Sequence, residues 1–205
     1  KKKDLTKFQS YSKGADNLIQ LSDNLFKKTG VKYITAFALS SNNLNRSKKI
    51  VDTILNILDL NLDKALNEKI NFSISIRGDL RFLSSNLKKK IKQLELRYSS
   101  HKKKLIILMN YSGRSDIISI TNKINSLQKR TNIKNFYNYS ILSGIPDPDF
   151  LIRTGGYQRI SDFLLFNISF TELFFTKKLW PDLRYHDVER YINQYMKIER
   201  KFGLW

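Results

Sequence analysis

Apolar residues along the chain alternate between helical spacing and short continuous runs. Spacing typical of amphipathic helices covers Gly14–Lys28, Ser47–Leu66, Leu83–Tyr98, Arg114–Lys129 and His186–Phe202. The runs between these segments are short and rich in β-branched and aromatic residues, which is typical of buried strands. The expected strands are Val31–Ser40, Ile70–Ile76, Lys104–Asn110, Phe150–Thr154 and Leu173–Thr176.

Helices that alternate with buried strands predict an α/β protein with a central, mostly parallel β-sheet flanked by helices. A chain of 205 residues with 41% hydrophobic content has enough apolar material for one domain, so residues 1–205 are expected to fold as a unit. The chain begins with Lys1 and not with Met. We therefore expect it to be a fragment that lacks its beginning.

Polar clusters follow four of the expected strands. They are Ser40–Arg46, Arg77–Asp79, Asn110–Asp116 and Arg153–Gly156. Each cluster alone could be an ordinary turn. In parallel sheets, however, ligands bind outside the carboxyl ends of the strands, so the four together predict a binding site at that edge.

The charge balance favours an anionic partner. Lys and Arg number 37 and Asp and Glu 18, for a formal charge of +19. The alternative is that the lysines are scattered over solvated faces, and they do occur in every segment. Cysteine is absent and only two histidines are present, which excludes disulfides, a thiolate nucleophile and histidine-rich metal clusters.

The stretch "RTGGYQRIS" carries the most specific candidate chemistry. Arg153 and Arg159 offer planar donor forks that match phosphate oxygens. Gly155 and Gly156 would let backbone N–H groups point at the anion, and Ser161 adds a hydroxyl. These residues predict a diphosphate site. The alternative is that both arginines pair with nearby carboxylates, namely Asp147, Asp149 or Asp162.

Glu172 is the other unusual residue, because it stands in the apolar segment "NISFTELFF". A carboxylate there is costly unless a cation or a donor meets it. One interpretation is a salt bridge with a lysine. The other is a Mg²⁺ ligand that serves the diphosphate site.

The motifs of the chain, taken together, resemble those of the cis-prenyltransferases, and bacterial undecaprenyl diphosphate synthases are the nearest pattern. The resemblance rests on "FALSSNNLNR", "RGDLRF", "NYSGRSDI", "LIRTGGYQRISDFLLF", "TELFFTKKLWPDL" and "ERKFG", in the family's order across the whole chain. It implies successive addition of isopentenyl diphosphate to an allylic diphosphate such as farnesyl diphosphate. The implied product is a polyprenyl diphosphate, undecaprenyl diphosphate in the nearest pattern.

The resemblance also assigns roles to residues. Arg153, Arg159 and Ser161 would bind isopentenyl diphosphate, and Glu172 would bind Mg²⁺. Lys7 lies near a family position that grips the allylic diphosphate. The family's cluster near the reacting carbons corresponds to Ser40, Asn43 and Arg46.

Further implications concern the assembly and the growing chain. The family implies a homodimer that buries the region Glu172–Pro181. A hydrocarbon product needs a dry channel, and we expect an apolar cleft bordered by the helix Ser47–Leu66. We expect a cytoplasmic protein that can make peripheral contact with a membrane.

Two other classes remain open at this stage. The family's N-terminal aspartate motif is expected upstream of Lys1, and Asn42 and Leu44 depart from its usual residues. These departures favour a non-catalytic partner subunit, whereas an intact diphosphate site favours an enzyme. A nucleic-acid-binding protein would show a basic stripe interleaved with aromatics, and the aromatics here lie mostly in apolar runs. We therefore expect no nucleic-acid partner.

Overall fold

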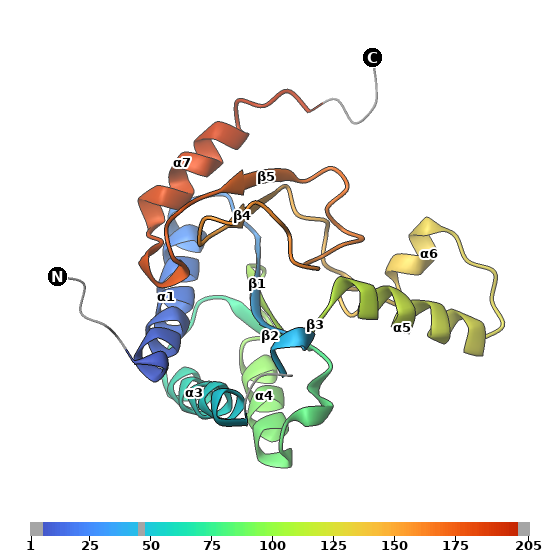
Figure 1. Cartoon of the computed structure of the whole chain (residues 1–205), viewed down its shortest axis with the longest axis horizontal. Helices are drawn as coiled ribbons and strands as arrows, with labels where there is room; N and C mark the ends of the chain where they lie inside the picture. Colours follow the sequence, from blue (N-terminus) through green and yellow to red (C-terminus); the bar gives the residue numbers. More distant parts are fainter. Residues whose placement is uncertain (1–5, 45–47, 201–205) are drawn as a thin grey trace.

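A computed structural model describes residues 6–44 and 48–200 of the chain, without the side chains of Lys7, Asn43 and Lys134. Figure 1 shows its helices and strands. The helices are α1 (Lys7–Lys28), α2 (Ser41–Leu44), α3 (Lys48–Asn67), α4 (Ser85–Arg97), α5 (Gly113–Ser126), α6 (Ile133–Tyr137) and α7 (Tyr185–Tyr195), with 3-10 turns η1 (Leu80–Phe82) and η2 (Trp180–Asp182). The strands are β1 (Tyr33–Ser40), β2 (Ser73–Gly78), β3 (Lys104–Tyr111), β4 (Phe150–Arg153) and β5 (Glu172–Phe175).

The centre of the fold is a parallel three-stranded sheet in the order β1-β3-β2. Lys104, at the start of β3, lies opposite Tyr33 of β1 and Ser73 of β2. The three strands therefore begin at one edge and end together at the other. This confirms the predicted α/β fold with a parallel sheet flanked by helices.

The last two strands form a second parallel pair. Phe150 lies opposite Glu172 and Arg153 opposite Phe175. Among the described residues, β4 and β5 bond to each other and not to the three-stranded sheet. The sequence predicts both strands but not this division, because strand pairing depends on partners distant in sequence.

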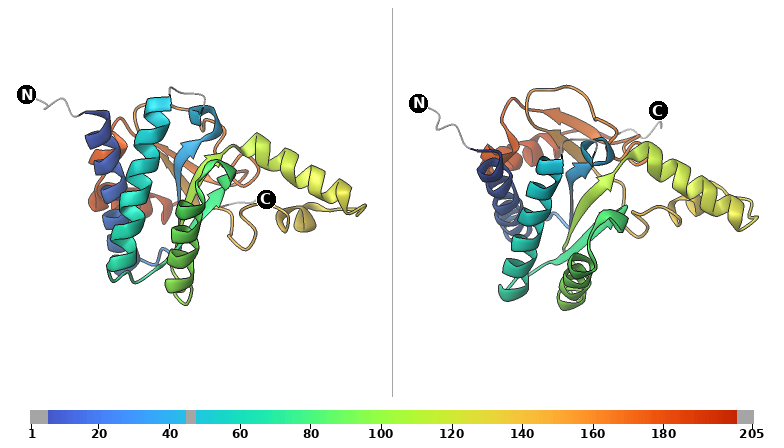
Figure 2. Two further views of the ribbon diagram at one scale, coloured as in Figure 1. Left: turned by 90° about the horizontal axis from the view of Figure 1, so that it is seen from below. Right: turned by 60° about the horizontal axis from the view of Figure 1, so that its bottom comes forward.

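Both faces of the three-stranded sheet are covered. Helices α3 and α4 lie side by side over one face (Figure 2), where Leu94 of α4 packs with Ile74 and Leu105. Ile106 and Leu108 alternate to the other face and pack against Leu164 from the C-terminal half of the chain. Helices α5 and α6 project from the body, as Figure 1 shows.

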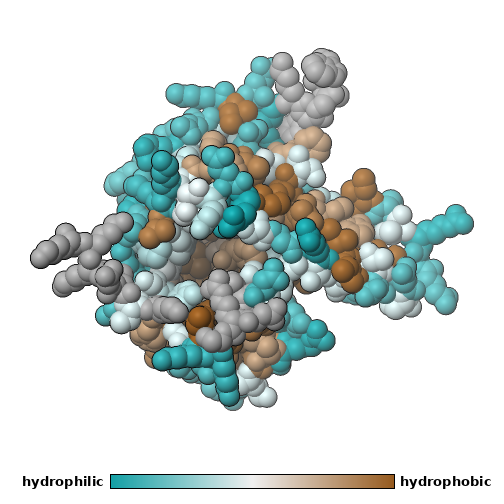
Figure 3. Space-filling model, viewed as in Figure 1, coloured by the Kyte–Doolittle hydropathy of each residue, from teal (hydrophilic) through white to brown (hydrophobic). Residues whose placement is uncertain are grey.

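A hollow with an apolar floor opens on the face seen in Figure 3. Several apolar side chains of α3 and β1 pack against the main core cluster but remain only partly buried. They are Ile54, Leu55 and Leu58 on α3, and Ile34 and Ala36 on β1. These residues are the part of the fold in which the sequence predicts an apolar cleft beside the Ser47–Leu66 helix.

The first helix begins earlier than its apolar pattern predicts, at Lys7 instead of Gly14. The Thr6 hydroxyl accepts a hydrogen bond from the Gln9 amide, and the Gln9 side chain accepts one from the Thr6 amide. This capping box starts the helix. Gly14 sits inside it because Trp180 packs there: an added Cβ would lie 3.2 Å from Trp180 Cδ1.

The last helix is shorter than predicted, since α7 ends at Tyr195 and not at Phe202. Residues 196–200 continue without helix, and residues 201–205 lie outside the described chain. In the described ranges, no helix combines the length and the apolar character needed to cross a membrane.

Gly78 supplies a test of the fold. Its φ is +130°, and an added Cβ would lie 1.8 Å from the Met109 carbonyl oxygen. We expect Gly78→Ala to lower the free energy of unfolding by at least about 2 kcal/mol, because strained backbone and a backbone clash combine. Urea denaturation would measure this change.

Two other glycines distinguish the effect of backbone strain from the effect of the contact with Met109. Gly144 has a φ of +79° but open space around it, and Gly30 also has open space. Gly144→Ala should cost less than Gly78→Ala, and Gly30→Ala should cost the least. Equal losses at Gly78 and Gly144 would show that the contact with Met109 does not matter.

Candidate diphosphate site

Three of the polar clusters meet at the carboxyl edge of the parallel sheet. Ser40, the last residue of β1, lies opposite Tyr111, the last residue of β3. Gly78, the last residue of β2, lies opposite Met109. The segments that start at Ser40, Arg77 and Asn110 therefore converge, as the sequence predicts.

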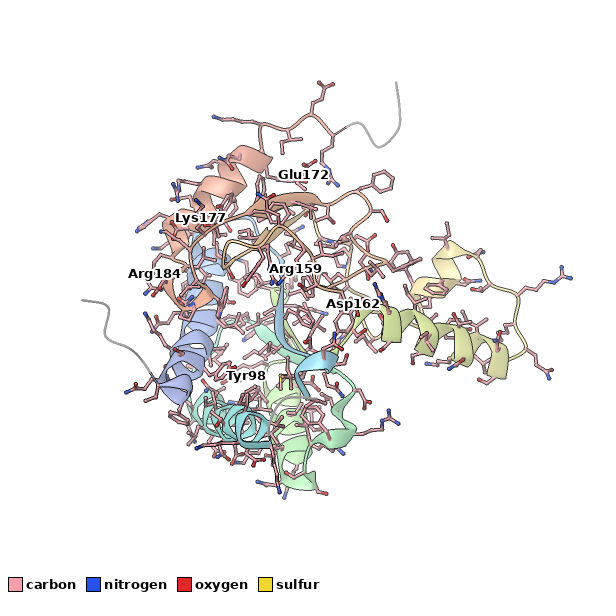
Figure 4. The ribbon with its side chains drawn as sticks, in the orientation of Figure 1. Tyr98, Arg159, Asp162, Glu172, Lys177 and Arg184 are labelled. Carbon is pink, nitrogen blue, oxygen red and sulfur yellow. The ribbon has the colours of Figure 1, made fainter. Side chains whose placement is uncertain are left out.

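The fourth cluster reaches this edge through the loop after β4. Phe163 stacks on Phe37 of β1, with ring centroids 4.9 Å apart, and its ring meets that of Tyr111 edge-on. The neighbouring Asp162 accepts a hydrogen bond from the Ser112 hydroxyl, directly after β3. Figure 4 shows Asp162 beside the first turn of α5. The loop that carries Arg159 and Ser161 is thereby attached to the end of the main sheet.

The carboxylates that could have neutralised the two arginines are engaged elsewhere. Asp147 accepts from the Tyr137 hydroxyl and the Asn167 amide, Asp149 from the Tyr195 hydroxyl and Arg200, and Asp162 from Ser112 and the Arg114 amide. No salt bridge within residues 6–44 and 48–200 involves Arg153 or Arg159. The interpretation as internal ion pairs is therefore wrong.

The two arginines differ in their surroundings. Arg153 is half-buried, and its Nε is buried without a hydrogen-bond partner in the described structure. A buried donor without an acceptor is costly, and an anion would satisfy it. Arg159 is exposed and lies over the Tyr157 ring, 4.2 Å from the ring centroid. The Arg153 guanidinium is thus partly enclosed by the fold, whereas the Arg159 guanidinium is accessible to a ligand from solvent.

The two glycines have a different role from the expected one. The Gly155 amide donates to the Lys178 carbonyl at 2.8 Å, and the Gly156 amide to the Thr176 carbonyl at 2.9 Å. The prediction that these N–H groups point at an anion is wrong. With φ of +87° and +82°, the glycines make the turn that joins β4 to the segment after β5.

The structure describes the other predicted site residues to different extents. Ser40 is half-buried at the end of β1, and Ser161 is exposed next to Asp162. Arg46 lies outside the described residues. The backbones of Lys7, at the start of α1, and Asn43, in α2, are described but their side chains are not.

Glu172 is not brought to the arginines within one chain. It begins β5 opposite Phe150, three positions before the pair Arg153–Phe175, which corresponds to about 10 Å along the strands. An odd number of steps also reverses the face of a strand. Figure 4 accordingly shows Glu172 well apart from Arg159.

No cation meets Glu172 in the described part of the chain. It makes no salt bridge there, so the interpretation as a lysine pair is wrong. The same part of the chain contains no group of three or more His, Cys, Asp or Glu side chains that could hold a metal ion. Mg²⁺ is usually held by one or two carboxylates together with substrate phosphates and waters, so Glu172 could supply only part of such a site.

The side chains of the turn after β2 bond to other parts of this chain. Arg77 Nη1 donates to the Ile141 carbonyl at 2.8 Å and to the Ser143 carbonyl at 3.1 Å. Asp79 accepts from Arg81 at its amide, Nε and Nη2. The motif therefore secures a neighbouring loop and starts η1.

Sequence reasoning missed Asp116 as a structural residue. It is 8% exposed in the first turn of α5, and accepts from the Ser140 hydroxyl at 2.9 Å and from the Ile141 amide at 3.4 Å. Burial raises the pKa of this carboxyl above its ordinary value, and the Ser140 hydrogen bond opposes that shift. An acidic residue at a helix start, after the cap Ser112, was the available signal.

The structure is an α/β fold in which a loop that carries Arg159 is attached to the carboxyl edge of a parallel sheet, as a candidate anion site. The model of the family described as "Putative undecaprenyl diphosphate synthase" matches residues 1–203. The chain belongs to this family and is a prenyltransferase.

Relatives and solved structures agree with this assignment. The chain is 36% identical over 203 residues to an isoprenyl transferase of Rickettsia sibirica, covering 97% of this chain and 89% of the relative. It is 33% identical over 216 residues to an isoprenyl transferase of Thermotoga maritima, covering 99% and 90%. The crystal structure of "a probable undecaprenyl diphosphate synthase" from Campylobacter jejuni has a TM-score of 0.83 and 28% identity, covering 94% of this chain and 92% of that one.

A plant structure is similar to the same degree. Lavandulyl diphosphate synthase from Lavandula x intermedia, in complex with dimethylallyl diphosphate, has a TM-score of 0.84 and 29% identity. The match covers 97% of this chain and 90% of that one. Proteins with similar folds are thus named after different products.

Asp116 gives a pH-dependent prediction. Since its folded pKa is raised, the folded state keeps a proton that the unfolded state loses at about pH 3.9. The stability contributed by this group should therefore fall as pH rises from about 4 towards the raised pKa. Asp116→Asn should remove this fall, so the variant should gain stability relative to the natural chain across that range.

Urea denaturation at a series of pH values would measure the difference. Ser140→Ala is the matched control, because it removes the hydrogen bond but keeps the titrating carboxyl. Parallel stability–pH curves for the natural chain and Asp116→Asn would contradict the raised pKa.

Proposed function

We propose that this prenyltransferase adds isopentenyl diphosphate units to an allylic diphosphate such as farnesyl diphosphate, with cis double bonds. The observation that carries the proposal is that Arg153 and Arg159 make no salt bridge within the described residues, while the loop that carries Arg159 is attached to the end of the main sheet. We further propose that the product is undecaprenyl diphosphate. The descriptions of the family and of the Campylobacter structure support this choice.

In the proposed reaction, a carbon–carbon bond forms between the two substrates as the C–O bond of the allylic substrate breaks and releases its diphosphate, and isopentenyl diphosphate loses a proton. Arg153, Arg159 and Ser161 would bind the diphosphate of isopentenyl diphosphate and orient its double bond. Positioning of two reactants supplies much of the acceleration in such a step. Lys7 would help grip the allylic diphosphate, and Ser40, Asn43 and Arg46 would surround the reacting carbons.

The hollow beside α3 is the proposed route for the growing hydrocarbon. Half-buried apolar residues of α3, such as Ile54 and Leu58, are the candidates for the wall of this route. Apolar surface buried by each added isoprene unit would stabilise the bound product. The chain length would then depend on how far this hollow extends.

Mg²⁺ is part of the proposal, with Glu172 as its candidate ligand. A divalent cation would neutralise diphosphate charge when bound. Glu172 alone does not fit a complete site in one described chain, as its distance from Arg153 along the strands shows. The proposal for the ion therefore rests on the diphosphate substrates and on Glu172, which makes no salt bridge with another described residue.

We also propose a homodimer, in a cytoplasmic protein whose lipid product brings it into peripheral contact with a membrane. Apolar side chains of β5 and the segment after it are exposed: Leu173 by 42%, Phe175 by 37% and Leu179 by 54%. A gathered apolar surface of this kind is typical of a protein interface. The region is the one for which the sequence predicts the dimer contact.

The reaction is tested by incubating the full-length protein with radiolabelled isopentenyl diphosphate, farnesyl diphosphate and Mg²⁺, and separating the products by size. Label in long, chloroform-soluble chains is expected. No incorporation, together with activation of another prenyltransferase on mixing, would instead favour a non-catalytic partner subunit.

Arg159 is expected to contribute directly to isopentenyl diphosphate binding. Hydrogen bonds to charged groups contribute about 1.5–3 kcal/mol. Arg159→Ala should therefore weaken this binding by roughly ten- to a hundredfold, since about 1.4 kcal/mol is a factor of ten. Arg159→Lys should recover only part of it, because a point charge does not reproduce the fork.

Calorimetric titration with each diphosphate separately would measure both affinities. Affinity for the allylic diphosphate should stay nearly unchanged. Loss of allylic binding with intact isopentenyl diphosphate binding would reverse the assignment of the two substrates. Unchanged affinity for both would make Arg159 a structural residue.

For the dimer, we expect light scattering at micromolar concentration to give twice the mass of the chain. Leu173→Asp combined with Leu179→Asp should shift the mass to that of a monomer, because two charges would be buried at the interface. Leu96→Asp is the control, since Leu96 is 65% exposed on α4. A monomeric natural chain, or a dimer that survives the double substitution, would contradict the proposed interface.

A further inference from the structure

The loop after Arg159 has an unusual backbone. Three of its residues are not glycine and yet have positive φ: Ser161 at 52°, Asp162 at 65° and Leu164 at 48°. Such conformations are unfavourable for residues with a side chain, and persist only where the surroundings hold them. The loop that carries the proposed diphosphate ligands must therefore be held in place.

Asp162 holds the loop to the first turn of α5 by three hydrogen bonds, and its carboxylate also lies 3.9 Å from Arg114 Nε. Its carboxylate accepts from the Ser112 hydroxyl and from the Arg114 amide at 3.2 Å, and its backbone carbonyl accepts from the Gly113 amide at 2.8 Å. The first amides of a helix have no partner inside the helix, and they favour a negative charge. Asp162 satisfies two of them at once.

The neighbouring side chains show that the fit is close. A Cβ on Gly113 would lie 2.6 Å from the Leu165 Cβ and 3.1 Å from the Asp162 carbonyl oxygen. Phe163 stacks on Phe37, and Leu164 is only 3% exposed. The loop is thus seated by apolar contacts on one side of Asp162, while Ser161 on the other side is exposed.

From this arrangement we propose that Asp162 is a positioning residue for the diphosphate site. It does not itself bind substrate, because its carboxylate faces α5. It fixes the strained backbone from which Ser161 and Arg159 reach the anion, so that little entropy is lost when isopentenyl diphosphate binds. This inference rests on the proposed function, and it identifies a residue that the resemblance does not assign.

Asp162→Ala should raise the KM for isopentenyl diphosphate by about tenfold, since the two hydrogen bonds from its carboxylate that fix the loop are lost. The KM for the allylic diphosphate should stay within about twofold. Asp162→Asn keeps one acceptor oxygen and should recover most of the effect. Ser112→Ala should give the same pattern more weakly, and should add little in combination with Asp162→Ala because both act through one contact.

Asp187→Ala is the matched control. Asp187 also meets a helix start, accepting from the Arg184 amide at 3.0 Å and from Lys178 at 2.6 Å, but it belongs to α7. The Asp187→Ala substitution should lower the melting temperature without changing the ratio of the KM for isopentenyl diphosphate to the KM for the allylic diphosphate. Steady-state kinetics on the full chain and thermal unfolding would be measured for every variant.

The outcomes distinguish a failure of the proposed function from a failure of the positioning role of Asp162. An inactive natural chain that does not bind isopentenyl diphosphate would overturn the proposed function. An active natural chain whose Asp162→Asn and Ser112→Ala variants lose stability, but keep the same ratio of KM values, would overturn the positioning role alone. A selective rise in the KM for isopentenyl diphosphate, rescued by Asn, would support it.

Discussion

The parallel pairing of β3 with both β1 and β2 is the constraint on which the rest of the structure depends. Because all three strands start in one register, their ends and the polar residues after them arrive at one edge. Burial of Leu105, Ile106 and Leu108, each with 0% exposure, keeps β3 in the centre. A shift of one residue would turn these side chains to the wrong face and separate the clusters.

The site is completed by a segment far away in sequence. The loop after β4 returns to the end of β3, where Phe163 packs against Phe37 and Asp162 meets the first turn of α5. Apolar stacking and a helix N-terminus thus act together on one loop. In the part of the chain that the structure describes, Arg153 and Arg159 make no salt bridge, because the nearby carboxylates already serve other donors.

Glu172 shows how one fold can separate residues that sequence reasoning groups together. It lies nineteen positions after Arg153 in the chain, yet the parallel register places it at the other end and on the other face of the β4–β5 pair. On that face, Phe174 stacks on Tyr191 of α7 with ring centroids 5.0 Å apart. Adjacency in a motif therefore does not imply adjacency in space, because strand direction and alternation decide it.

The sequence by itself determined the class of fold, the approximate helices and strands, and the arginines of the candidate site. Hydrophobic periodicity and the residue types around the Gly155-Gly156 turn are local signals that need no distant partner. Only the tertiary structure decided that β4 pairs with β5, that the glycine amides bond to Thr176 and Lys178, and that Asp162 secures its loop on α5. These outcomes depend on contacts between residues far apart in the chain, and no local pattern specifies such contacts.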